Sequence, residues 1–368
     1  GCLLINSALD VAPHDAAIGR VVSGYLDEIR DFFRRNLVAA RGAGQVSSRY
    51  GKIEDIVRGM KVVLPDGQTL DVRPLARRAT GPDLLQLFVG SEGTLGVITE
   101  LTLRIWKRPE REHGVVLAMP SVAAGLAALR EIMQGELRPA VTRLYDEPET
   151  RARTEGVAAF ASLPVMLMLV FSGPGRLARI EEELSLEILA RHGGVLADDA
   201  PYREWIEHRY VSYSPKWQST DHYMDTIEVT GSWSELPAMH RRMREAVREI
   251  HPHLHFGTHW SHVYPEGACQ YMTFRLPPMS EAEGVALHAR VWEAIESITL
   301  DCGGSISHHH GVGAFRNRWM RGELGAGLDV LQALKDALDP GNLMNPGKLG
   351  LRPAGGARGL ATPAEAAP

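Results

Sequence analysis

A glycine-rich loop is the first stretch of this sequence whose residue types could do chemistry. Residues 90–96 read Gly-Ser-Glu-Gly-Thr-Leu-Gly and lie directly before a predicted strand. Glycines let a backbone approach a ligand closely and present bare N–H groups, which suits a pyrophosphate or the edge of a flavin ring. The loop neither opens a helix as GxGxxG nor forms a Walker motif, which disfavours nicotinamide and nucleoside-triphosphate cofactors. A plain glycine-rich turn is the alternative interpretation.

Three adjacent histidines form the second such stretch, at His308, His309 and His310, followed by Gly311-Val312-Gly313. In an extended chain the first and third imidazoles share a face while the second points away. They could be metal ligands, a catalytic base or a solvated polar turn. No Cys, Asp or Glu lies at ligand spacing and adjacent ligands rarely complete a tetrahedral zinc site, so we expect no metal.

Two further residues on predicted strands are candidates, Tyr271 and Arg143. A tyrosine on a sheet strand is often a core or edge aromatic, and a lone strand arginine is often one half of a surface ion pair. An arginine fork, however, also suits a substrate carboxylate or phosphate. Both interpretations stay open on the residues alone.

The middle of the chain repeats one order of elements. The first round comprises a strand at 115–119, a helix opened by Ser121, strands at 141–145 and 165–171, and a helix that carries Leu177, Ile180 and Leu184 and stops at Gly193-Gly194. The second round comprises a strand at 226–230, a helix at 236–250, strands at 254–263 and 269–276, a helix at 280–298 and a segment at 303–307. Each round reads β-α-β-β-α-β, the split unit of ferredoxin-like folds. Two such units predict one wide antiparallel sheet with helices on one face and an open face as the floor of a ligand site.

Upstream of this repeat, two short strands flank the Pro65-Asp66-Gly67 turn. Residues 80–105, TGPDLLQLFVGSEGTLGVITELTLRI, contain the glycine-rich loop and a strand in which Val97, Thr99, Leu101, Leu103 and Ile105 are expected to share one face. This stretch resembles the second part of the FAD-binding domain of vanillyl-alcohol-oxidase-type flavoenzymes, and most of all the alkyldihydroxyacetonephosphate synthase branch. The resemblance runs from about residue 41 to 350 and implies FAD as the cofactor.

The resemblance also implies roles for individual residues. The segment matching Glu92 to Ile98 lines the flavin in that family, and the expected cofactor-binding residues are Gly90, Ser91, Glu92, Gly93, Thr94, Leu95, Gly96, Val97 and Ile98. The family places catalytic histidines in a segment like SHHHGVG, an active-site tyrosine at Tyr271 and an active-site arginine at Arg143. A base of this kind removes a hydroxyl or carbon proton beside the flavin N5.

The sequence departs from the synthase pattern at one substrate contact. A further arginine that binds the substrate phosphate in those enzymes falls near Ser214 here, with Lys216 nearby. Two enzyme interpretations therefore compete: ether-lipid synthesis, in which a fatty alcohol replaces the acyl group of acyl-dihydroxyacetone phosphate, and flavin-linked oxidation of a 2-hydroxy acid such as lactate or glycolate.

Residues 1–45 differ in character and predict a short helical segment, with an apolar stripe from Ile18 to Leu37. The segment resembles the C-terminal, dimerisation half of a tetracycline-repressor-type regulator, which implies a homodimer and a third, ligand-sensing interpretation. No helix-turn-helix accompanies it, so we expect no DNA binding. The family's upstream FAD subdomain has no counterpart here, and we expect a truncated or fused chain that binds FAD poorly.

Composition bounds the remaining possibilities. The 368 residues are 44% hydrophobic and 23% charged, with a net charge of -5, which disfavours a nucleic-acid partner. No apolar run is long enough for a membrane span, and three widely spaced cysteines suit a reducing cytoplasm. We thus predict an α+β enzyme for a small-molecule substrate. Its expected parts are residues 1–45, a second lobe of an FAD domain at 46–111, a substrate-binding cap at 112–300, a flavin-covering segment at 301–350 and a disordered tail at 351–368.

Overall fold

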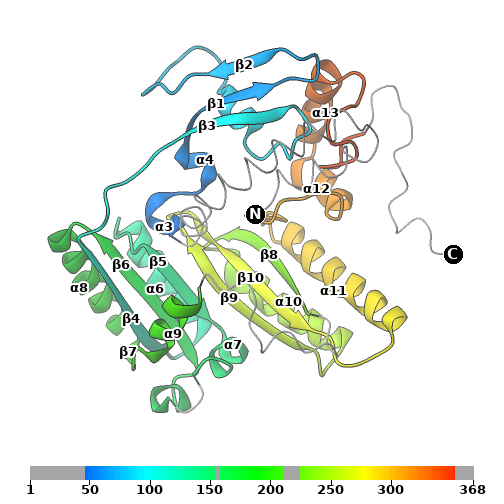
Figure 1. Cartoon of the computed structure of the whole chain (residues 1–368). Coiled ribbons are helices and arrows are strands. Elements are labelled where there is room, and N and C mark those ends of the chain that lie inside the picture. Colours follow the sequence, from blue (N-terminus) through cyan, green and yellow to red (C-terminus); the bar gives the residue numbers. More distant parts are fainter. Residues whose placement is uncertain (1–45, 155–156, 210–223, 353–368) are drawn as a thin grey trace. The chain divides into compact units, whose positions relative to one another are not determined.

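The computed structural model describes residues 46–154, 157–209 and 224–352, which form two compact units (Figure 1). The large-sheet unit comprises residues 46–50 and 107–308, and the small-sheet unit comprises residues 51–106 and 309–352. The predictions for residues 1–45 and for the tail beyond 352 lie outside the described residues.

A seven-stranded sheet forms the large-sheet unit, in the order β7-β4-β6-β5-β9-β10-β8. Every pairing in it is antiparallel. Its strands are β4 (Arg111–Met119), β5 (Val141–Tyr145), β6 (Val165–Gly173), β7 (Val195–Leu196), β8 (Met224–Ser232), β9 (His255–Val263) and β10 (Gly267–Arg275). The pairing of β5 with β9 joins the two repeats into one sheet.

Four long helices cover one face of this sheet: α6 (Val122–Gln134), α8 (Gly175–Arg191), α10 (Leu236–Ile250) and α11 (Glu281–Asp301). The core between helices and strands is built from apolar residues such as Leu129, Leu144, Leu167 and Trp260, all fully buried. Shorter helices complete the unit: α3 (Ser47–Tyr50), α7 (Glu147–Arg151), η2 (Ala158–Ala161) and α9 (Ala200–His208).

The predicted α+β class, wide antiparallel sheet and two-fold order of elements are confirmed. The second round ends differently from the first, because Ser305 makes only a single bridge to Thr230 on β8 instead of a full strand. Leu177, Ile180 and Leu184 of α8 are exposed, and the buried face carries Ala178, Glu181, Ser185, Ile188 and Leu189. Glu181 can be buried because it pairs with Arg49 on α3 at 2.7 Å.

A three-stranded antiparallel sheet, ordered β2-β1-β3, forms the small-sheet unit together with short helices. Its elements are α4 (Ile53–Ile56), β1 (Val57–Val63), β2 (Thr69–Val72), α5 (Leu84–Phe88), β3 (Val97–Leu103), η4 (Asn317–Trp319), α12 (Met320–Leu324) and α13 (Gly327–Leu338). The expected alternation along β3 fails, because a bulge against Lys61 and Val62 brings Ile98 and Leu101 to the same core.

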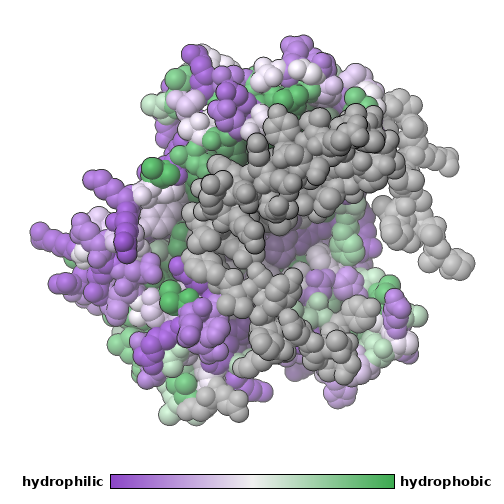
Figure 2. Space-filling model, viewed as in Figure 1, coloured by the Kyte–Doolittle hydropathy of each residue, from purple (hydrophilic) through white to green (hydrophobic). Residues whose placement is uncertain are grey.

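The contact boundaries of the two units fall at 50/51, 106/107 and 308/309. They run close to the expected boundaries, and the assignment of FAD-binding and substrate-binding roles to these parts stays a prediction. Among the described helices, none combines the length and apolar content that a membrane span needs. On the face shown in Figure 2, the surface over α8 and β4 at the left is mainly hydrophilic.

Candidate functional site

A row of polar residues crosses the face of the large sheet opposite its four long helices. Tyr145 on β5 pairs with His259 on β9, which pairs with Tyr271 on β10, which pairs with Glu228 on β8. Directly paired residues point to the same side of a sheet. Because the next residues, Leu144 and Trp260, lie in the core beneath the helices, the row faces away from the helices.

Arg143 lies two residues before Tyr145 and therefore on the same face of β5. Its guanidinium donates to the Tyr145 hydroxyl and lies 3.3 Å from His259 Nε2. It also lies over the Trp205 ring, 5.7 Å from the ring centroid. No carboxylate of the described residues pairs with Arg143, so its partners within the described chain leave its positive charge without an acidic counter-charge.

Tyr271 lies between Arg143's neighbour His259 and the buried Glu228. Its ring centroid lies 4.8 Å from that of His259. Burial raises the pKa of the Tyr271 phenol above its usual value, and electrostatic interactions with Glu228 and Cys269 raise it further. The Thr226 hydrogen bond and the charge of Arg143 oppose this shift. The phenol is therefore held protonated and can serve as a hydrogen-bond donor or a general acid.

Tyr271→Phe should flatten the loss of stability at alkaline pH. Below about pH 10 the phenol is protonated in both the folded and the unfolded chain. Above it the unfolded chain loses the proton first, so the free energy of unfolding falls by up to about 1.4 kcal/mol per pH unit for this group. Urea unfolding at several alkaline pH values should show a steeper fall for the wild type than for Tyr271→Phe. Parallel curves would contradict the raised pKa, and Tyr50→Phe serves as control.

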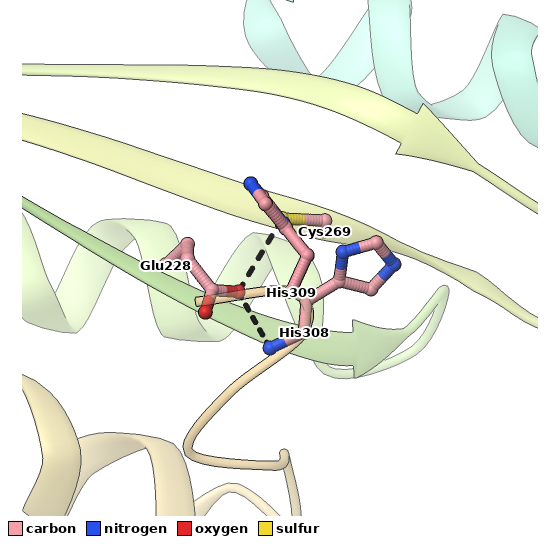
Figure 3. A group of neighbouring side chains, drawn as sticks. All are labelled: Glu228, Cys269, His308 and His309. Carbon is pink, nitrogen blue, oxygen red and sulfur yellow. Dashed lines mark hydrogen bonds between the residues drawn. The ribbon is translucent and has the colours of Figure 1, made fainter. Parts of the chain in front are cut away.

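Glu228 is fully buried and connects the row to the first histidine. Its carboxylate accepts the Ser307 hydroxyl at 2.7 Å and the backbone N–H of His308, and the Cys269 thiol lies 4.0 Å away. Figure 3 shows the Glu228 side chain reaching from β8 toward the His308 backbone N–H and the Cys269 thiol.

Glu228, Cys269 and His308 also offer one carboxylate, one thiol and one imidazole whose ligand atoms lie within 4.8 Å of one another. Glu228 and Cys269 lie far from the histidines along the chain, so ligand spacing in the sequence gives no sign of this grouping. A divalent cation could be held by such a set. The hydrogen bonds already formed by both Glu228 oxygens account for the grouping without an ion, and the expectation of no metal stays a prediction.

The glycine-rich loop lies in the small-sheet unit, where it meets the segment that follows the histidines. Glu92, a non-glycine residue with φ of 52°, is buried and its carboxylate accepts the N–H groups of Val312 at 2.6 Å and Gly313 at 2.7 Å. Asn345 donates from its side chain to the Glu92 carbonyl. His309 and His310, which directly precede this segment, stack edge to face at 4.6 Å. The two stretches singled out in the sequence thus meet directly.

A buried lysine braces the same loop. Lys335 on α13 donates to the Thr94 carbonyl at 2.9 Å and the Met344 carbonyl at 2.6 Å, and it pairs with Asp339. All three ammonium protons therefore have acceptors, as a buried ammonium requires. The Asp339 carboxylate in turn accepts the N–H groups of Leu343 and Met344, which holds the chain after α13 against the loop.

The expected cofactor-binding residues differ in their burial. Ser91, Glu92, Thr94, Leu95 and Gly96 are buried, whereas Gly90 and Val97 are exposed and Gly93 and Ile98 are half-buried. The backbone N–H groups of Gly93, Leu95 and Gly96 form no hydrogen bond with any part of the chain that the structure describes. A Cβ placed on Gly90 would meet open space. Bare donors of this kind suit the oxygen- and nitrogen-rich edge of FAD, so these residues fit that cofactor.

Gly96 has a packing role. A Cβ at this position would come within 2.7 Å of the Val62 side chain and 2.9 Å of the Val63 carbonyl. Gly96→Ala should therefore lower the unfolding free energy of the small-sheet unit by roughly 1–3 kcal/mol. Gly327→Ala, whose Cβ would meet only Leu324 at 3.6 Å, is the matched control. Equal urea midpoints for the two variants would exclude this close approach.

Three residues of the polar row escaped the sequence prediction, namely Tyr145, Glu228 and His259. Their common signal is two-residue spacing from a predicted residue or placement opposite one in a neighbouring strand. One sequence does not give the register between strands, so it cannot show which residues lie opposite each other.

The chain is similar to known FAD-linked oxidases. The family model described as FAD linked oxidases, C-terminal domain, matches residues 108–349. The chain is 32% identical over 328 residues to the Escherichia coli K12 uncharacterized FAD-linked oxidoreductase YgcU, covering 85% of this chain and 67% of that protein. It is 28% identical to the Dictyostelium discoideum alkyldihydroxyacetonephosphate synthase, covering 85% of this chain and 56% of that protein.

Two further similarities extend these results. The chain is 29% identical to the Arabidopsis thaliana mitochondrial D-lactate dehydrogenase [cytochrome], covering 85% of this chain and 55% of that protein. A solved alkyldihydroxyacetonephosphate synthase structure shares the fold, with a TM-score of 0.62 and 23% identity over 82% of this chain and 55% of that one. The chain thus spans little more than half the length of the synthase and lactate dehydrogenase relatives.

The cofactor and class expected from the sequence agree with these findings, whereas the regulator-like interpretation of residues 1–45 is unsupported. The match over residues 108–349 and the 32% identity with an FAD-linked oxidoreductase lead to one assignment. The chain belongs to the FAD-linked oxidase family, whose members use FAD as cofactor.

Proposed function

We propose that this protein performs flavin chemistry on a small hydroxy or keto substrate that carries an anionic group, in the manner of alkyldihydroxyacetonephosphate synthase. The observation that carries the proposal is Arg143, a part-buried guanidinium that no described carboxylate neutralises. A phosphate or carboxylate of the substrate would supply the missing charge through paired hydrogen bonds. His259 and Tyr145 hold the guanidinium in place for that contact.

Tyr271 and the histidines would handle protons next to the bound anion. Tyr271, held protonated by burial, would donate to a substrate oxygen. His308, with His309 and His310 beside it, would accept a proton from the substrate hydroxyl or carbon. Bound FAD supplies the redox centre at N5, and residues 90–98 would hold it through backbone donors. In the synthase reaction the acyl group would leave as a carboxylate and a fatty alcohol would take its place, for ether-lipid synthesis in the cytoplasm.

Oxidation of a 2-hydroxy acid is the second candidate, supported by the 29% identity with a D-lactate dehydrogenase. In that reaction the base would take the hydroxyl proton, bound FAD would supply the two-electron acceptor, and a 2-keto acid would leave. Ser214, where the synthases carry a phosphate-binding arginine, favours this smaller substrate and lies outside the described residues.

One anaerobic experiment separates the two. The protein with saturating FAD is mixed with D-lactate, with glycolate, or with acyl-dihydroxyacetone phosphate and a labelled long-chain alcohol. Synthase activity predicts labelled ether product without lasting bleaching of the flavin, and dehydrogenase activity predicts bleaching with formation of the keto acid. If all three mixtures leave both flavin and substrates unchanged, the proposed function is wrong.

A further inference from the structure

Four side chains form a continuous line of hydrogen bonds within the large-sheet unit. His308 Nε2 lies 2.9 Å from the Tyr264 hydroxyl, and that hydroxyl donates to Ser47 Oγ at 3.1 Å. Ser47 Oγ lies 2.8 Å from His262 Nδ1. The residues come from α3, from the end of β9 with the residue after it, and from the segment after α11, so only the fold brings them together.

We propose that this line is a proton relay that carries a proton between His308 and His262. The relay rests on the proposed function for its catalytic meaning, since His308 is the proposed proton acceptor there. It adds Tyr264, Ser47 and His262 as residues that act through His308 and do not need to touch the substrate.

The direction of the hydrogen bonds permits the transfer. With Tyr264 donating to Ser47, Ser47 can donate to His262 Nδ1 and His308 Nε2–H can donate to the Tyr264 oxygen. When His308 gains a proton at Nδ1, its Nε2 proton passes to Tyr264, the Tyr264 proton to Ser47 and the Ser47 proton to His262. Each hydroxyl gives one proton and receives one, so the positive charge moves from His308 to His262 and neither hydroxyl becomes charged.

The surroundings of His308 and His262 favour one positive charge on the pair. The ring centroids of His262 and His308 lie only 4.9 Å apart, so two positive charges would repel each other and the pair should carry one at a time. Glu228 from β8 accepts the His308 backbone N–H, and Cys269 from β10 lies opposite His262 in the strand register. The nearest basic residue of α3, Arg49, is directed to Glu181 and adds no second cation to the line.

A purely structural set of hydrogen bonds predicts a different response from a relay. In the structural case, removing one hydroxyl changes the residues bonded to it and, through the contact of the two rings, the signals of both histidines, but leaves the isotope dependence of turnover unchanged. In the relay, removing the Tyr264 hydroxyl also interrupts proton transfer to His262, two hydrogen bonds away along the line. Tyr264→Phe keeps the ring, whose centroid lies 5.6 Å from that of His308, and removes only the oxygen.

The test is long-range proton–nitrogen NMR of the histidine rings across pH, with assignments from His262→Gln and His308→Gln. In the wild type we expect His262 and His308 to titrate as a coupled pair. Tyr264→Phe should shift the ring nitrogens and titration midpoint of His262, Ser47→Ala should do so for His308, and Ser47→Thr should restore the wild-type pattern. Tyr50→Phe, which removes a hydroxyl that bonds Ser172 outside the line, should change neither.

The result that would overturn the relay is a folded Tyr264→Phe with unchanged His262 signals together with a folded Ser47→Ala with unchanged His308 signals. A proton inventory of turnover in mixed light and heavy water is the second readout. The relay predicts a curved inventory in the wild type, and a linear one in Tyr264→Phe. The NMR experiment needs neither FAD nor substrate, so its outcome holds even if the proposed function fails. Uncoupled histidines in an active enzyme would count against the relay alone.

Discussion

Replacing Lys335 by methionine should lower the free energy of unfolding by roughly 3–5 kcal/mol, because it leaves a buried carboxylate without its counter-ion. Lys335 and Asp339 are 2% and 1% exposed, and the carboxylate has no access to water that could replace the ammonium. The Thr94 carbonyl loses its donor in the same variant, so the loop at 91–96 should also bind FAD more weakly. Urea unfolding and titration with FAD, followed by flavin fluorescence, measure the two effects.

Arg321→Met is the matched control for this variant. Arg321 and Asp329 form an ion pair in the same unit, but their side chains are 57% and 62% exposed. Solvent-exposed pairs contribute about 0–1 kcal/mol, so this variant should remain near wild type. Removing both charges, in Lys335→Met with Asp339→Leu, should recover part of the stability. If Lys335→Met lowered the free energy of unfolding no more than Arg321→Met does, the buried Lys335–Asp339 pair would not stabilise the loop.

Arg143→Lys should reduce kcat/KM by about two orders of magnitude, because a single ammonium cannot reproduce the two-pronged contact of a guanidinium with an anionic group. Lysine would also lose the contacts with Tyr145 and His259 that hold the side chain in place. Steady-state kinetics with whichever substrate proves active would show the loss mainly in KM if Arg143 holds the anionic group equally in ground and transition states.

Two comparisons make this prediction specific. Arg138→Lys changes an exposed arginine just before the same strand and should leave kcat/KM unchanged. A neutral substrate analogue, with an amide or alcohol in place of the anionic group, should react equally slowly with wild type and Arg143→Lys. A full effect on the neutral analogue would mean that Arg143 supports the fold of the site and does not bind the anion.

The order of strands and helices could be predicted because the large sheet is made of two local repeats with clear apolar periods. The second half of the chain folds as β8, α10, β9, β10 and α11, close to the predicted ranges. The orientation of α8 could not be predicted, since Glu181 is buried through a partner more than a hundred residues away in the sequence, Arg49. A single-helix pattern holds no information about such a partner.

The site was predictable only where a motif marked it. Tyr271, Arg143 and His308 were singled out, and the fold places the first two near the same polar row. Glu228 and His259 carry no motif and became visible only through strand register. Glu92 was expected to contact the cofactor, which stays a prediction. Its carboxylate has a second role that the sequence did not indicate, since it accepts the backbone N–H groups of Val312 and Gly313.

A crystal structure of the protein with FAD and a bound anionic substrate, such as D-lactate or dihydroxyacetone phosphate, would decide whether Arg143 and the glycine-rich loop have the proposed roles. We expect the flavin ring against the backbone of residues 90–98 and the anionic group within hydrogen-bond distance of the Arg143 guanidinium, with the Tyr271 hydroxyl on a substrate oxygen. FAD bound away from that loop, or an anion bound away from Arg143, would show that these roles are wrong.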